Sequence, residues 1–160
     1  MRVSLAAIGR MKAGPERELV DRYLQRFGAT GGPVGLDYAG LSEFPESRGA
    51  QAEMRKREEA ARLAATLPEG AASIVLDERG RTLSSEEFAR AIADLRDGGR
   101  RGLGILIGGP DGHDPALRQR ADLVLALGRM TFPHQIARIL LAEQLYRAVT
   151  ILSGHPYHRV

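Results

Sequence analysis

Two glycine-bearing turns in the second half of the chain are the segments best suited to hold a small ligand. The first ends an aliphatic run and reads Ile107-Gly-Gly-Pro-Asp-Gly112, and the second reads Leu127-Gly-Arg-Met-Thr-Phe132. Glycine lets backbone groups approach a ligand closely, and open α/β sheets bind ligands beyond the carboxyl ends of their strands. The spacing predicts one pocket built mainly from backbone, with Met130 and Phe132 as apolar walls.

Neither turn matches a nucleotide-binding motif. Gly108-Gly-Pro-Asp-Gly112 lacks the lysine and the serine or threonine of a P-loop, and no G-x-G-x-x-G opens a helix there. On spacing alone, the first turn is equally consistent with a connection that binds nothing. The second could be a strand-to-helix connection in which Met130 and Phe132 face the core.

The C-terminal tail concentrates aromatic and basic side chains. It reads Gly154-His-Pro-Tyr-His-Arg159, and such groups can stack on bases and hold phosphates. His155 and His158 have the spacing of some zinc motifs, but no cysteine or carboxylate pattern accompanies them, so we expect no metal site. A tail that is only docked on the domain is the alternative.

Composition bounds the class of protein. The 160 residues, 43% hydrophobic and 27% charged, fit one globular domain, residues 1–160. The absence of cysteine excludes disulfides and thiolate chemistry. The first apolar segment is broken by Gly9, and no apolar run reaches the roughly 18 residues of a membrane span, so we expect a cytoplasmic protein without membrane contact. The net charge of +3 is compatible with a polyanionic partner but not diagnostic.

Strands and helices alternate along the chain. We expect strands at 2–9, 34–39, 72–76, 102–107 and 123–127, and helices at 15–27, 50–67, 114–121 and 133–152, with one more helix after the capping box Ser84-Ser-Glu-Glu87. Residues 41–49 are expected to form a loop and residues 77–80 a turn. The alternation predicts an α/β fold with a mostly parallel sheet flanked by helices.

The last helix is apolar around much of its circumference. Ile139, Leu140 and Leu141 are consecutive apolar residues, so they cannot all face the same neighbour. A second copy of the chain would cover the remaining side, and we therefore expect a symmetric homodimer.

Four segments taken together resemble a known family. They are Leu103–Gly112, Leu127–Ile139, Glu143–Arg147 and His155–Arg159. The chain resembles the RlmH (YbeA-type) group, the small stand-alone members of the SPOUT methyltransferases, over its whole length. The resemblance implies a C-terminal trefoil knot, a homodimer, and methylation of N3 of a pseudouridine in the helix 69 loop of 23S (large-subunit) ribosomal RNA with S-adenosyl-L-methionine. Because topology rules disfavour knots, the knot rests on the resemblance alone.

The resemblance also assigns residues, segment by segment. The implied cofactor-binding residues are Leu76 at a strand end, Gly108 in the first turn, and the second turn, Leu127, Gly128, Arg129, Met130, Thr131 and Phe132. It implies no role for His113.

Methyl transfer from a sulfonium is an in-line displacement, in which the protein mainly aligns the reactants. The acceptor N3 must lose its proton, and a histidine could take it; we favour His158, then His134. Arg159 would stabilise charge on the uracil carbonyls or hold a phosphate, and Tyr157 would stack on the base. For these residues, packing or RNA positioning without proton transfer is the alternative. The expected RNA contacts are Arg138, His155, Tyr157 and Arg159.

Three other functions stay open at this point. The chain could be a SPOUT methyltransferase acting on another RNA, such as tRNA. It could be a non-enzymatic, ribosome-associated RNA-binding factor. It could also be a nucleotide-binding α/β enzyme that uses Gly108–Gly112 as a phosphate loop, although the missing lysine counts against this.

Overall fold

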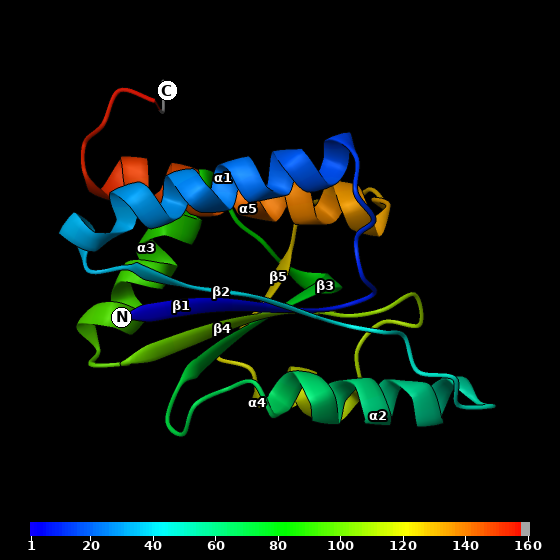
Figure 1. The fold of residues 1–160 in the computed structure, drawn as a ribbon. Helices are drawn as coiled ribbons and strands as arrows, with labels where there is room; N and C mark the ends of the chain where they lie inside the picture. The colour runs from blue at the N-terminus through cyan, green and yellow to red at the C-terminus, as the bar shows by residue number, and fades with distance from the viewer. Residues whose placement is uncertain (158–160) are drawn as a thin grey trace.

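A computed structural model, which describes residues 1–157, contains a five-stranded sheet with helices on both faces (Figure 1). The strand order is β2-β1-β4-β3-β5, and each pair of neighbours is parallel. The expected α/β fold with a mostly parallel sheet is confirmed. The strands are β1 (Arg2–Ile8), β2 (Asp37–Phe44), β3 (Ala72–Thr82), β4 (Gly102–Ile107) and β5 (Leu123–Ala126).

Helices α1, α3 and α5 cover one face of the sheet, and α2 and α4 cover the other (Figure 1). Helix α5 lies against both α1 and α3. The central strand β4 is buried throughout, as its sequence Gly-Leu-Gly-Ile-Leu-Ile requires. The helices are α1 (Pro15–Gly31), α2 (Ala52–Ala64), α3 (Ser85–Asp97), α4 (Pro115–Arg120) and α5 (His134–Leu152), with a short 3-10 turn η1 (Gly32–Val34).

The predicted capping box starts α3. The Ser84 hydroxyl accepts the Glu87 amide at 3.2 Å, and the Glu87 carboxylate accepts the Ser84 amide at 2.7 Å. Two otherwise unpaired amides of the first turn are thereby satisfied.

The expected boundaries around β2 are wrong. Strand β2 continues to Phe44 where a loop was expected, because it is an edge strand whose alternation is diluted by polar residues and Gly40. Helix α1 also continues to Gly31. A Cβ on Gly31 would lie 2.1 Å from the Leu36 carbonyl oxygen, so this glycine permits close packing inside the helix end.

The turn expected at 77–80 is instead an irregular part of β3. Leu125 of β5 is paired with both Leu76 and Arg81, across a register shift. A Cβ on Gly80 would lie 2.6–2.7 Å from backbone atoms of Val124 and Leu125, so β3 crosses very close to β5 here. The knot implied by the resemblance stays a prediction.

Within residues 1–157, no helix combines the length and apolarity needed to cross a bilayer.

Candidate functional site

The irregular middle of β3 and the carboxyl ends of β4 and β5 surround a cleft of about 360 Å³. The sheet register explains why distant segments meet here, because Leu76 is paired with Ile107 on β4 and with Leu125 on β5. All but one of the expected cofactor residues line the cleft: Leu76, Gly108, Leu127, Gly128, Met130, Thr131 and Phe132. Arg129 is exposed and is not among the lining residues.

The second turn has its apolar side chains at the cleft rather than in the core. Met130 is 78% exposed, which excludes the alternative in which it faces the core. Gly128 has a φ of 155°, a conformation that disfavours a side chain. Phe132 is half-buried and lines the same cleft. The turn therefore offers exposed apolar surface beside backbone that no side chain covers at Gly128.

His113, for which no role was expected, lies beneath the first turn. The imidazole is buried, and its Nε2 lies 3.1 Å from the Leu76 carbonyl oxygen. Because a carbonyl only accepts, Nε2 carries the hydrogen and donates it. Burial lowers the pKa of His113, with Asp77 and the Leu76 carbonyl opposing the shift. A neutral His113 thus ties the end of β3 to the β4 turn; its place just after the glycine turn was the signal available in the sequence.

Gly108 is packed against that imidazole. A Cβ at position 108 would lie 3.0 Å from Nε2 of His113, which is tighter than ordinary contact. The requirement for glycine at 108 therefore comes first from His113. The close approach of the Gly108 backbone to a ligand, expected from the sequence, stays a prediction.

Charged groups line one side of the cleft. The Arg118 guanidinium lies 3.6 Å from the Asp77 carboxylate, whose side chain is 8% exposed. Nε of Arg118 is buried without a hydrogen-bond partner among the described residues. Glu78, Arg79 and Lys56 complete this side.

Helix α2 holds the first turn in place. Arg55 donates two hydrogen bonds to Asp111, at 2.6 and 3.0 Å. A Cβ on Gly109 would lie 2.9 Å from the buried carboxylate of Glu59, which accepts the Ser47 amide at 2.9 Å. The turn is thus fixed from outside the cleft.

A smaller cavity of about 260 Å³ adjoins the cleft. It lies between the end of β1 and the first turn of α5, and it shares Pro110 and His134 with the cleft. Its other lining residues are Ile8, Gly9, Arg10, Met11, Glu46, Pro133, Gln135 and Arg138.

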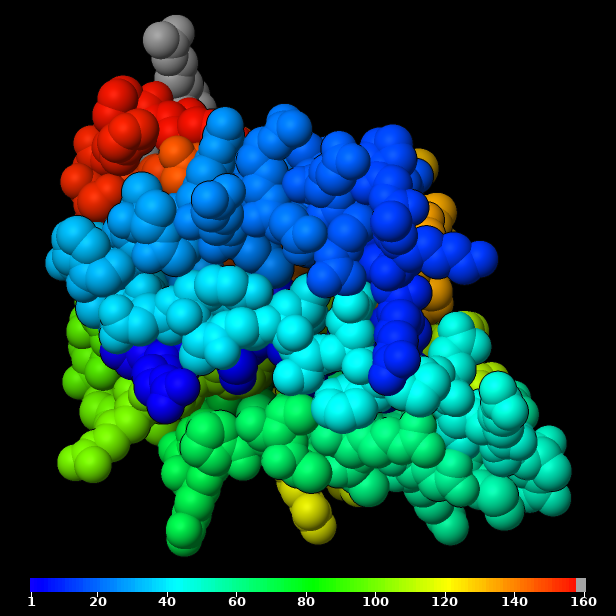
Figure 2. Space-filling view, viewed as in Figure 1, coloured from blue at the N-terminus to red at the C-terminus, as the bar shows by residue number. Residues whose placement is uncertain are grey.

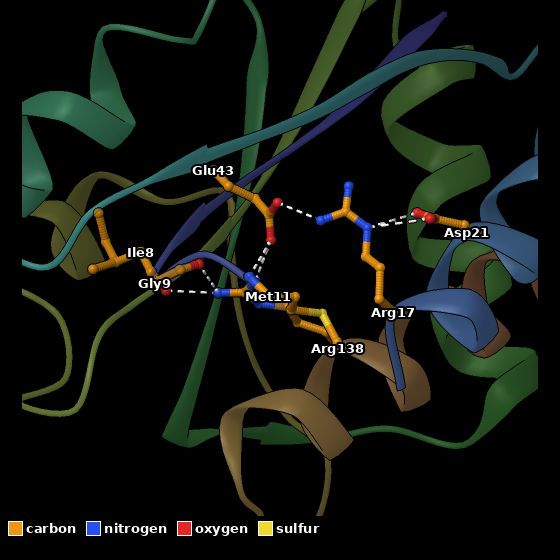
Figure 3. Close-up of polar contacts among 7 residues, drawn as sticks. All are labelled: Ile8, Gly9, Met11, Arg17, Asp21, Glu43 and Arg138. Carbon is orange, nitrogen blue, oxygen red and sulfur yellow. Dashed lines mark hydrogen bonds and ion pairs between the residues drawn. The ribbon is translucent and has the colours of Figure 1, made fainter. Parts of the chain in front are cut away.

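Arg138 is an internal residue that also lines this smaller cavity, and its expected contact with RNA stays a prediction. It is 3% exposed, and its guanidinium donates to Glu43 at 2.7 Å and to the carbonyls of Ile8 and Gly9 at 2.6 Å each (Figure 3). The spacing from His134 correctly places both on one side of α5. At Arg138, however, this side of the helix packs against the end of β1 and does not face solvent.

Glu43 is the centre of this network (Figure 3). Besides Arg138, its carboxylate accepts the Met11 amide at 3.0 Å and the Arg17 guanidinium at 2.6 Å, and Arg17 also pairs with Asp21. Burial raises the pKa of Glu43, but the Met11 amide, Arg17 and Arg138 outweigh it, so the pKa is lowered. The network joins α1, α5 and the ends of β1 and β2.

The tail starts at the opposite end of α5. Helix α5 has 19 residues and is therefore about 28 Å long. This length separates the tail from His134, which lies at the cleft. The Tyr157 hydroxyl donates to Glu143 at 3.2 Å, and its ring lies 4.6 Å from that of Tyr146. Burial, followed by the neighbouring Tyr23 and Glu143, raises the pKa of Tyr157 to about 12.

The structure therefore does not bring Tyr157 to the cleft of its own chain. His155 is exposed at the same distant end. His158 and Arg159 lie outside the described residues. Among residues 1–157, no three potential His, Asp or Glu ligands come together as a metal site would require.

A further hollow, of about 510 Å³, lies at the amino ends of β1 and β4. On the face shown in Figure 2, β2 separates α1 from α2 above this region. It contains none of the expected site residues and lies at the end of the sheet opposite to that where α/β proteins bind ligands.

Comparisons with known proteins agree with the resemblance seen in the sequence. The family described as "Predicted SPOUT methyltransferase" matches residues 1–158. A protein from Brucella anthropi named "Ribosomal RNA large subunit methyltransferase H" is 69% identical over 159 residues, covering 99% of each chain. Its namesake from Brucella abortus (strain S19) is 64% identical over 168 residues, again covering 99% of each.

Among solved structures, the SpoU methyltransferase AviRb from Streptomyces viridochromogenes, in complex with AdoMet, aligns with a TM-score of 0.42 and 17% identity. The alignment covers 96% of this chain and 61% of that one. At this level it adds nothing to the assignment, which rests on the family match and the close relatives. The chain belongs to the SPOUT methyltransferase family, in the group of the ribosomal RNA large subunit methyltransferases H.

Proposed function

We propose that this protein uses S-adenosyl-L-methionine to methylate N3 of a pseudouridine in the helix 69 loop of 23S ribosomal RNA. The proposal places the reaction in the cytoplasm, on the large subunit within the ribosome. The observation that carries it is the meeting of Leu76, Gly108 and the 127–132 turn around one cleft, in a chain 69% identical to a ribosomal RNA large subunit methyltransferase H. The modified atom and the base come from the family resemblance.

The residues of the cleft fit the proposed cofactor. Leu76, Leu127 and Phe132 provide apolar surface for an adenine ring. The unpartnered Nε of Arg118 is suited to the cofactor's carboxylate, and Asp77 to its ammonium group. Backbone groups of both glycine turns complete the set.

The bound cofactor would supply an activated methyl group on a sulfonium. Transfer breaks the carbon–sulfur bond and forms a carbon–nitrogen bond; the electron pair goes to sulfur, and the N3 proton is released. The protein's residues align the two partners and accept that proton. His134 lines both the cleft and the adjoining cavity, so it is the described histidine placed to take it, directly or through water. His158 keeps the same proposed role from the resemblance. The reaction requires no metal ion, because the methyl group is already activated.

A homodimer would bring the tail to the reaction. Because α5 holds residues 155–157 about 28 Å from the cleft of the same chain, we propose that the tail of one copy completes the cleft of the other. Tyr157, His158 and Arg159 would there contact the base and its phosphates, and His155 and the exposed Arg129 would contact neighbouring phosphates.

The dimer face would involve α5. Ile136 is 39% exposed, and Leu140 is partly exposed on the same side of the helix. Leu141 is fully buried in its own chain, so Ile136 and Leu140 are the side chains left for a partner. A native mass of two chains at micromolar concentration would support the dimer, and a mass of one chain would contradict it.

The direct test uses labelled S-adenosylmethionine and ribosomes from cells that lack the activity. The proposal predicts label in 23S RNA, at N3 of one pseudouridine, after nuclease digestion and mass spectrometry. Label in tRNA alone would indicate the alternative substrate. RNA binding without release of S-adenosylhomocysteine would indicate a non-enzymatic factor.

A further inference from the structure

The cavity beside the cleft has the size and walls of a site for one flat ring. Its volume of about 260 Å³ falls just below the roughly 300–1,000 Å³ typical of drug-sized ligand pockets. Met11, Pro110 and Pro133 give it apolar walls, and Pro110 and His134 form its border with the cleft. A ring held here would present one edge to whatever occupies the cleft.

One side of the cavity is rich in hydrogen-bond donors. The first amides of α5, like those of any helix, have no hydrogen-bond partner within the helix. Pro133, the residue before them, provides no side-chain cap. Arg138 also lines the cavity, and its Nε is buried without a hydrogen-bond partner among the described residues. These groups suit the carbonyl oxygens of a pyrimidine.

Glu46 provides a hydrogen-bond acceptor on another part of the cavity wall. This exposed carboxylate lines the cavity, and within residues 1–157 it has neither an ion pair nor a hydrogen bond. A Cβ on Gly9 would lie 3.6 Å from Nη2 of Arg138 and 3.7 Å from Oε1 of Glu46, so the bare glycine keeps the space between them open. A carboxylate accepts hydrogen bonds and repels anions, which favours a neutral base with an N–H group over a phosphate.

We propose that this cavity receives the acceptor base and that Glu46 selects pseudouridine by accepting its N1–H. The proposal rests on the methyl transfer proposed above. In uridine, N1 carries the glycosidic bond and has no hydrogen; in pseudouridine, N1–H is a free donor. Glu46 is thus a specificity-determining residue that does not take part in the transfer of the methyl group.

The test compares methyl transfer to two kinds of ribosome: one whose large subunits have pseudouridine at the target position, and one from cells lacking the pseudouridine synthase, whose large subunits have uridine there. Wild-type protein should prefer the first. Glu46→Ala should lower kcat/KM on the pseudouridine subunits by about 10- to 100-fold and leave kcat/KM on the uridine subunits unchanged. Glu46→Gln, which keeps one acceptor oxygen, should retain part of the preference. Glu69→Ala, an exposed glutamate at the distant hollow, is the matched control and should change neither value.

An equal loss on both substrates, or no loss on either, would overturn the role of Glu46. Wild-type protein with no preference for pseudouridine would also overturn it. If wild-type protein methylates neither kind of subunit, the proposed function itself fails, and this result is distinguishable because every variant would then be equally inactive.

Discussion

The two ends of α5 are built differently. At its first turn, the helix borders a cleft whose walls are held from several sides, by His113 on Leu76, by Arg55 on Asp111, and by the buried Arg138 on β1. At its last turn, the described tail packs through Tyr157 on side chains of the same helix, Tyr146, Glu143 and Arg147. The tail leaves α5 there, at the end opposite to the first turn of this helix (Figure 1).

This contrast separates two tasks. The walls of the cleft come from one chain and are held by contacts within it, which favours cofactor binding because less has to be ordered when the ligand binds. The tail end has aromatic and basic groups but no cleft. Binding the cofactor should therefore depend on one chain, whereas methylation should depend on joining the ends of two.

Removing the tail should have the largest effect, because it should abolish methyl transfer and leave cofactor binding nearly unchanged. Deleting residues after Pro156 removes little core but takes away the proposed base and RNA contacts. Methyl transfer to ribosomes should fall by about 10³-fold or more, because alignment and charge stabilisation are both lost. Affinity for S-adenosylmethionine, measured by calorimetry, should change by only a few-fold. Full methylation by the truncated protein would show that the tail is merely a packed end.

Breaking the internal support of the cleft end should instead destabilise the whole chain. Arg138→Met leaves Glu43 without its buried partner and should lower the free energy of unfolding by about 3–5 kcal/mol in urea titrations. The double variant Arg138→Met/Glu43→Gln removes the charge that Arg17 alone would then balance, and should recover part of this loss. A single variant as stable as wild type would show that the network does not hold the helix in place.

A change in the first turn should weaken cofactor binding without unfolding the protein. Gly108→Val pushes against His113 and should lower affinity for S-adenosylmethionine by about 10-fold or more. Gly108→Ala should have a smaller effect, which His113→Ala in the same chain should relieve by removing the ring. Gly32→Ala is the control, since a Cβ there meets nothing closer than 3.8 Å. Unchanged affinity in Gly108→Val would remove this turn from the site.

The smallest effect concerns pH. The pKa of His113 is lowered below its ordinary value of 6.5, so the unfolded chain binds the proton at higher pH than the folded chain does. The contribution of neutral His113 to the free energy of unfolding is therefore fully present above pH 6.5 and is lost as the pH falls through the lowered pKa of the folded protein. His113→Gln should abolish this part of the pH dependence of unfolding, while His134 and His155 remain in both proteins. Identical pH profiles would contradict the assignment.

Much of the cleft end could be predicted from the sequence, because its signals are local. Aliphatic runs that stop at glycines marked the ends of β4 and β5, and a parallel sheet necessarily brings such ends together. The capping box of α3 could also be predicted, because both of its hydrogen bonds join residues within one stretch of four.

What could not be predicted depends on contacts between distant residues. Helical spacing placed Arg138 beside His134, but the bonds that bury it come from Ile8, Gly9 and Glu43, far away in the chain. The same is true of His113, whose partner is the carbonyl of Leu76. The second half of the edge strand β2 was not predicted, because it is half-exposed and lacks strong alternation.

The central claim is that the cleft of one chain works with the tail of another, and mixing two inactive variants tests it most directly. One variant carries Gly108→Val with an intact tail; the other has an intact cleft and lacks the residues after Pro156. After co-refolding, half of the dimers should be mixed, and each should contain one intact cleft facing one intact tail. We predict that methyl transfer to ribosomes returns to about a quarter of the wild-type rate. If the mixture is as inactive as its components while native mass spectrometry shows the mixed dimer, each tail serves its own chain and the claim is wrong.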